Sequence, residues 1–251
     1  MNVELRNSIE NLYAVFAGYP RPAKIEVCPC GCTPPDAAAP LVAVPLRSVR
    51  FIDMTGFAFS ALTTQGSDKD FRYLLPRLFE GLVEFNFPVD PEIVFGKLSY
   101  AKWRSWPSPE IAAIEEFVAA LWAAAITTYP VPNQLASFCD IESVLSSIAV
   151  TGLSLDPYLK LWAHVHCGPA DVNLIQFVAC NGERFADGAD YNGPFWDESP
   201  EQGKQLRQWL LLPDTMQRVR QAANVLPDDG CEHLLAQALQ TLETEFARSR
   251  A

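Results

Sequence analysis

The chain has 251 residues, of which 49% are hydrophobic and 20% charged. This composition is typical of a globular protein and excludes a disordered one. The net charge is −11. Because phosphate backbones and anionic membranes repel such a charge, it argues against a nucleic-acid binder and a membrane-surface protein, and it favours a basic protein partner.

The beginning of the chain carries Glu4, Arg6 and Glu10 among its apolar positions, so it lacks the uncharged run of a secretory signal. The most apolar run, residues 117–126, is too short to span a bilayer. We therefore expect a cytoplasmic protein without a membrane segment. In that compartment the seven cysteines are expected as reduced thiols and not as a disulfide framework.

The first third of the chain predicts a helix at the N-terminus, then irregular backbone, then a long helix. The stretch from Tyr19 to Val49 contains seven prolines and is expected to be irregular. Apolar residues then recur at helical spacing from Phe71 to Phe85. Ser67 and Asp70 resemble a capping box at the start of this helix, and Pro76 inside it predicts a kink or a split.

Pairs of a capping residue and a proline mark the starts of further helices, because proline is tolerated in the first helical turn. Helical spacing also predicts helices over residues 141–149 and 234–246. Gly168-Pro169 is expected to stop a helix, and the stretch from Phe185 to Ser199 is expected to be irregular. The capping pairs are Asp90-Pro91, Ser108-Pro109, Asp156-Pro157 and Ser199-Pro200.

These elements predict an all-α fold of roughly ten helices, stacked as antiparallel pairs. Either an irregular bundle or an array similar to HEAT and armadillo repeats fits, since no side-chain motif recurs at a fixed period. We expect a single helical domain over residues 1–251, with a subdivision into a main body, residues 1–184, and C-terminal helices, residues 185–251. The predicted core includes Leu78, Leu82, Leu121, Trp122, Val144, Leu145, Ile148, Trp162 and Leu239.

Three segments of the first half resemble a family of uncharacterised bacterial proteins. They are Pro45-Leu46-Arg47, the helix segment around Leu75-Pro76-Arg77, and the segment Trp103-Arg104-Ser105-Trp106-Pro107. Members of that family combine a cysteine-rich N-terminal stretch with a Leu-Pro-Arg helix and a Trp-x-x-Trp-Pro segment. The resemblance implies a bacterial, cytosolic protein and implies no activity.

Cysteines alternate in the segment Cys28-Pro29-Cys30-Gly31-Cys32. Thiolates are preferred zinc ligands, and a tetrahedral site needs a fourth one. The candidates for it are His164 and Cys167, which are three residues apart on one predicted helix face. The competing interpretation is that the alternating cysteines are reduced thiols in a proline-rich loop, since the usual Cys-x-x-Cys pairs are missing.

Acidic residues are concentrated in two segments. Asp187, Asp190 and Asp197 lie in one, and Asp228 and Asp229 in the other. The spacing around Asp187 does not fit a calcium loop, because glycine and serine occupy positions that need carboxylates. We expect at least one of these segments to form an acidic patch that meets a cationic partner, and the alternative is that they only keep the protein soluble.

Three further residues have a functional and a structural interpretation. Arg77 suits a carboxylate or phosphate ligand, but an ion pair with Glu80 on the helix surface is favoured. Trp103 and Trp106, three positions apart, suit a binding platform, but such residues more often close a core.

The sequence contains no glycine-rich phosphate loop, no Gly-x-Ser-x-Gly elbow and no His-Glu-x-x-His motif.

The sequence therefore favours a non-enzymatic acidic protein that binds a basic protein, with a toxin-neutralising immunity protein as its specific form. The alternative is a zinc-binding protein that uses the cysteine cluster, either in a structural zinc site or as a zinc-dependent enzyme.

Overall fold

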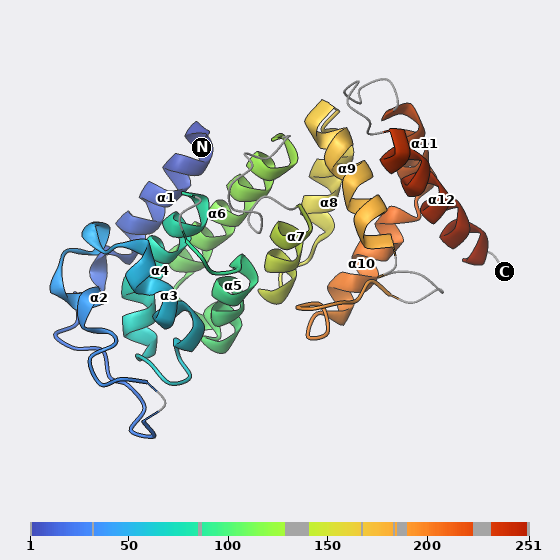
Figure 1. Ribbon diagram of the computed structural model, residues 1–251. Coiled ribbons are helices and arrows are strands. Elements are labelled where there is room, and N and C mark those ends of the chain that lie inside the picture. Colours follow the sequence, from blue (N-terminus) through green and yellow to red (C-terminus); the bar gives the residue numbers. More distant parts are fainter. Residues whose placement is uncertain are drawn as a thin grey trace. The chain divides into compact units, whose positions relative to one another are not determined.

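The computed structural model describes residues 2–31, 33–84, 87–128, 141–166, 168–182, 184, 190–222 and 232–249. The predicted all-α class is confirmed, because these residues form helices joined by turns (Figure 1). Extended pairing in the described part is limited to two isolated bridges, from Gln65 to Val27 and from Gln65 to Ala61. No helix of these described ranges combines the length and apolar character needed to cross a membrane.

The chain divides into two compact units by its internal contacts. The first comprises Met1–Ala124 and Gln134–Phe138, and the second comprises Ala125–Asn133 and Cys139–Ala251. The division therefore lies near residue 125, whereas the sequence suggested a boundary at residue 185. That the whole chain behaves as a single domain stays a prediction.

The described residues of the first unit form six α-helices and three short 3-10 helices, separated by irregular segments. The lengths of the α-helices range from 5 to 19 residues, which describes an irregular bundle better than a repeated array. Helix α4 contacts α1, α3 and α5 and is the central element. The bounds are α1 Val3–Val15, η1 Phe16–Gly18, α2 Ala39–Ala43, η2 Leu46–Ser48, α3 Phe51–Ser60, α4 Asp68–Val83, α5 Pro91–Tyr100, η3 Trp103–Ser105 and α6 Ser108–Ile126.

The start of α4 confirms the predicted capping box. The Ser67 hydroxyl accepts a hydrogen bond of 3.3 Å from the backbone N–H of Asp70, whose carboxylate accepts one of 2.7 Å from the N–H of Ser67. Pro76 does not split the helix, which continues unbroken to Val83. The proline costs one backbone hydrogen bond, and the burial of ten residues of α4 offsets that loss.

The centre of the first unit is aromatic. The Phe79 ring stacks on Phe95 at 4.9 Å and on Phe117 at 4.7 Å between centroids. Trp103 and Trp106 are 1% and 5% exposed, so they close this core and do not form a platform. The structural interpretation of the two tryptophans is therefore the right one.

The described residues of the second unit form six further α-helices. Gly168-Pro169 opens α9 and does not stop α8, so this prediction was wrong; α8 already ends at His164. No helix was predicted from the sequence over α9 or α11, nor over α2 and α3 of the first unit. A proline after glycine fits both a helix end and a first helical turn, so local sequence left the choice open. The bounds are α7 Ile141–Val150, α8 Asp156–His164, α9 Gly168–Asn181, α10 Pro200–Leu210, α11 Pro213–Gln221 and α12 Glu232–Arg248.

The predicted core residues are buried with one exception. Leu239 is half-buried, because the buried side of α12 is centred on Ala238, Leu242 and Glu245. The others, which are at most 2% exposed, are Leu78, Leu82, Leu121, Trp122, Val144, Leu145, Ile148 and Trp162.

Two buried ionic contacts tie the second unit together. Arg218 of α11 donates to the Asp171 carboxylate of α9 at 2.6 Å and to the carbonyl oxygen of Val165, after α8, at 2.7 Å. Glu142 of α7 accepts hydrogen bonds from Arg184 at 2.6 Å and from the indole N–H of Trp196 at 2.8 Å. Removal of one partner from such a contact leaves a buried charge unpaired and strongly destabilises the fold. We therefore assign these contacts a structural role.

Candidate binding pocket in the first unit

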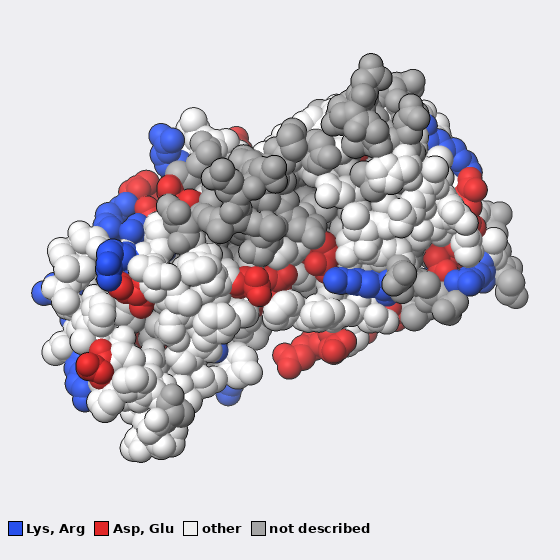
Figure 2. All heavy atoms as spheres, in the orientation of Figure 1, with Lys and Arg blue, Asp and Glu red and all other residues white. Residues whose placement is uncertain are grey.

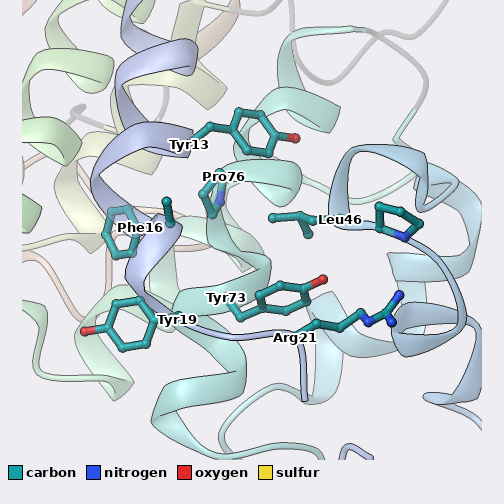
Figure 3. A pocket seen from close by; sticks show the side chains of 9 residues that line it. Tyr13, Phe16, Tyr19, Arg21, Leu46, Tyr73 and Pro76 are labelled. Carbon is teal, nitrogen blue, oxygen red and sulfur yellow. The ribbon is translucent and has the colours of Figure 1, made fainter. Parts of the chain in front are cut away.

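A pocket of about 490 Å³ opens on the first unit beside α4. Figure 3 shows Tyr73 and Pro76 of α4 between the rings of Phe16 and Tyr19 on one side and Leu46 on the other. This volume lies in the range of sites that hold small ligands or side chains. The described lining residues are Tyr13, Phe16, Ala17, Tyr19, Arg21, Pro45, Leu46, Tyr73 and Pro76.

The Tyr19 side chain is held in place by a partly buried ionic pair. Its hydroxyl donates to Glu110 of α6 at 2.7 Å and accepts from Arg72 of α4 at 2.7 Å. Arg72 also pairs with Glu110 at 3.1 Å and stacks over Trp106, 4.2 Å from the ring centroid. Burial and the hydrogen bond to Glu110 raise the pKa of Tyr19. The ring is thus a fixed and neutral wall of the pocket at physiological pH.

Tyr13 is held by a second network. Its hydroxyl donates to Glu80 at 2.5 Å, and Glu80 pairs with Arg77 at 2.6 Å. Arg77 also donates to the carbonyl oxygen of Val49 at 3.0 Å, so the predicted Arg77–Glu80 pair is confirmed but is half-buried and joins three segments. Burial and Glu80 raise the pKa of Tyr13. The guanidinium of Arg47 covers the Tyr13 ring at 3.7 Å from its centroid.

Arg21 is the charged residue among the described residues that line the pocket. It lies between Pro20 and Pro22, and Pro22 restricts the backbone of Arg21 to extended conformations. Its side chain is exposed, and no described carboxylate lies within ion-pair distance of it. Burial raises the pKa of Tyr73, and the charge of Arg21 opposes that rise. A chain of net charge −11 therefore presents a cation at this pocket.

The described lining residues have the composition of a binding site. The described residues at the pocket include no serine, cysteine, histidine or carboxylate. The tyrosine hydroxyls at positions 13, 19 and 73 all have a raised pKa, so they are poor bases and nucleophiles at neutral pH. What remains is an aromatic surface in fixed positions next to one cation, which is a common composition of binding sites.

The cysteine cluster is only partly within the described residues. Cys28 is half-buried and Cys30 is exposed, and the backbone N–H of Cys30 points to the Cys28 sulfur at 3.4 Å. Cys32 and Cys167 lie outside the described residues. No group of three His, Cys, Asp or Glu side chains in the described ranges could hold a metal ion.

The proposed helical pairing of His164 and Cys167 was wrong. Helix α8 ends at His164, and Val165 already has an extended backbone. The helix that would place the two residues on one face therefore does not extend past His164. The imidazole Nδ1 of His164 lies 2.6 Å from the carbonyl oxygen of Lys160, within its own helix.

The acidic segments are also only partly described. Asp190 and Asp197 are exposed, and neither forms an ion pair with another described residue. Figure 2 shows acidic side chains gathered at the loop that precedes α10. Trp196, which is buried, anchors this loop, whereas Phe195 is 40% exposed. Asp187, Asp228 and Asp229 lie outside the described residues, and the patch itself stays a prediction.

Comparison with known proteins identified no family: no family model, no curated protein and no solved structure matches the chain. The resemblance carried by the Leu-Pro-Arg and Trp-x-x-Trp-Pro segments therefore adds no activity to what the geometry suggests.

The pocket was not predicted from the sequence. Its walls come from α1, η1, the proline-rich stretch, η2 and α4, which are separated by up to about 60 residues of chain. The one local signal was Tyr19-Pro20-Arg21-Pro22, where each proline restricts the backbone of the aromatic or cationic residue before it. This stretch was expected only to be irregular.

Proposed function

We propose that this chain is a non-enzymatic interaction protein whose first unit takes an apolar side chain of a partner protein into the pocket beside α4. The observation that carries the proposal is the fixation of the aromatic walls. Tyr13 and Tyr19 are each held from behind by a carboxylate–arginine pair, so their rings are ordered before any ligand arrives. A preformed aromatic site costs little entropy on binding and is typical of interface hot spots.

The net charge supports a protein partner that is basic outside the contact with the pocket. A charge of −11 speeds the encounter with a cationic protein, and the exposed Asp190 and Asp197 contribute to that field. Toxin neutralisation is the specific form of this proposal that the charge favours, since toxins directed at nucleic acids are basic. The association is then fast at low salt and slows as salt is added.

A matched pair of substitutions tests the proposal. Ala17 lines the pocket, so Ala17→Phe places a ring in it, whereas Ala14→Phe adds the same ring to an exposed position of α1 outside the lining. Partners captured from the native host by the wild type are expected to persist with Ala14→Phe and to be lost with Ala17→Phe. Equal capture by both variants would show that the pocket does not bind the partner.

The zinc alternative rests on the alternation of Cys28, Cys30 and Cys32 in the sequence, and a separate experiment tests it. Protein purified without chelator is analysed for metal, beside the variant Cys28→Ser. About one zinc per chain, lost in the variant, would support this alternative. Zinc content near zero, with unchanged stability of the variant, would remove it.

A further inference from the structure

We infer that the partner segment in this pocket carries a side-chain carboxylate, from Asp or Glu, next to its apolar residue, and that Arg21 binds this carboxylate. The inference rests on the proposed function and names the chemistry of the ligand. It depends on the charge of the lining, on the surroundings of Arg21 and on the backbone beside it.

A cationic ligand fits the pocket poorly. Aromatic walls attract cations when their faces are open, but the Tyr13 ring already carries the guanidinium of Arg47, which also pairs with Glu10 at 2.6 Å. The charged side chain among the described lining residues is itself an arginine. A ligand cation would therefore meet repulsion from Arg21 and an occupied ring.

Arg21 has the capacity to bind an anion. It lies at the end of the pocket where the Tyr73 hydroxyl points, as Figure 3 shows. The other arginines around the pocket have partners: Arg47 pairs with Glu10, Arg72 with Asp68 and Glu110, and Arg77 with Glu80. Arg21 has no ion-pair partner among the described residues, so its fork of N–H donors is available to a carboxylate.

The neighbouring prolines favour a side-chain carboxylate over a chain terminus. Proteins that capture a terminal carboxylate commonly use a nest of consecutive backbone N–H groups. Pro20 and Pro22 have no N–H, so the backbone on either side of Arg21 cannot form such a nest. The recognition then depends on the guanidinium alone, which suits the carboxylate of Asp or Glu in a continuous segment.

Three short peptides test the inference with the full chain. They are acetyl-Glu-Phe-Glu-amide, its neutral counterpart acetyl-Gln-Phe-Gln-amide, and acetyl-Gln-Phe-Gln with a free terminal carboxylate. Binding is followed by two-dimensional NMR of the ¹⁵N-labelled protein at low salt. The wild type is expected to bind the Glu peptide about three- to tenfold more tightly than the neutral peptide.

Two variants that each remove one positive charge test whether the preference for the Glu peptide comes from Arg21. Arg21→Gln is expected to abolish the preference for the Glu peptide while it still binds the neutral peptide. Arg6→Gln, on an exposed position of α1 outside the lining, is expected to keep the preference. Because both variants lower the charge of the chain equally, the long-range field does not account for a difference between them.

The outcomes separate the inference from the proposed function. If the wild type binds the neutral peptide in the pocket and the Glu peptide no more tightly, the role of Arg21 is wrong and the pocket stands. If the peptide with the free terminus binds most tightly, the assignment to a side-chain carboxylate is wrong. If no peptide binds in the pocket, the proposed function fails together with the inference.

Discussion

The hydroxyl of Tyr19 donates a hydrogen bond of 2.7 Å to the carboxylate of Glu110, 91 residues later in the chain. The bond joins the proline-rich stretch to α6, and Arg72 of α4 contacts both of its members. One wall of the pocket is therefore set by an ionic pair that is mostly screened from solvent by the fold. Hydrogen bonds to charged groups in such places contribute more than neutral ones.

Removal of this hydroxyl is expected to destabilise the protein. Tyr19→Phe loses one bond to Glu110 and one from Arg72, and we expect the free energy of unfolding to fall by about 1–2 kcal/mol. Tyr100→Phe is the control, because Tyr100 is 64% exposed and makes a ring contact with Lys97 that does not involve its hydroxyl. Urea denaturation measures both. Equal, small losses in the two variants would show that the Tyr19 network is not energetically coupled to folding.

The three pocket tyrosines predict a loss of stability in alkali. The pKa values of Tyr13, Tyr19 and Tyr73 are raised in the folded protein, chiefly by burial. The folded state thus holds these protons more tightly than the unfolded state, whose tyrosines titrate near pH 10. This stability is fully present below about pH 10 and is lost as the pH rises from there toward the folded pKa values.

The alkaline prediction is checked by urea denaturation at several pH values from about 8 to 11. The wild type is expected to lose stability above about pH 10, and Tyr13→Phe is expected to lose less over the same interval. Tyr13 is chosen because its pKa is raised most by the combined effect of burial and Glu80. An identical pH profile of the variant and the wild type would contradict the assignment.

Gly203 of α10 is required by the backbone that lies against it. A methyl group at this position would come within 2.3 Å of the carbonyl oxygen of Tyr191. Gly203→Ala is expected to destabilise by about 2 kcal/mol or more, although alanine favours helices. Gly96→Ala in α5 is the control, because nothing lies within 4 Å of the added methyl group there. The control is expected to gain about 0.5–1 kcal/mol. A Gly203→Ala variant as stable as that control would show that α10 shifts freely away from Tyr191.

A pair of leucines tests the buried faces of the second unit. Leu145 is fully buried and Leu239 is half-buried. Leu145→Ala is expected to lower the free energy of unfolding by about 2–5 kcal/mol, and Leu239→Ala by clearly less. Thermal and urea denaturation compare them directly. A loss below about 1 kcal/mol for Leu145→Ala would mean that the packing face of α7 is misassigned.

Local signals explain what the sequence could predict. The capping box of Ser67 and Asp70 needs residues three positions apart, so its pattern is visible without any tertiary contact. The core leucines follow for the same reason from helical spacing. Helix α9 was missed because Gly168-Pro169 fits a helix end as well as a helix start, and what selects between them is packing against α12 and α11.

The pocket depends on contacts that no local pattern specifies. The partners of Tyr13 and Tyr19, Glu80 and Glu110, are 67 and 91 residues away. Arg77, Trp103 and Trp106 were the candidate contacts that the sequence offered. The structure places these three side chains behind the pocket wall or in the core, and brings Arg21 to the pocket.

The position at which a small apolar probe binds tests the central claim most directly. Acetyl-Gln-Phe-Gln-amide is titrated into the ¹⁵N-labelled chain, and the shifted amide resonances are assigned. Binding in the pocket predicts saturable shifts at Ala17, Tyr19, Leu46 and Tyr73 in the wild type, which Ala17→Phe abolishes and Ala14→Phe retains. Saturable shifts centred instead on the exposed Ile52 and Phe59 of α3, or no saturable shifts at all, would contradict the claim that this pocket is the binding site.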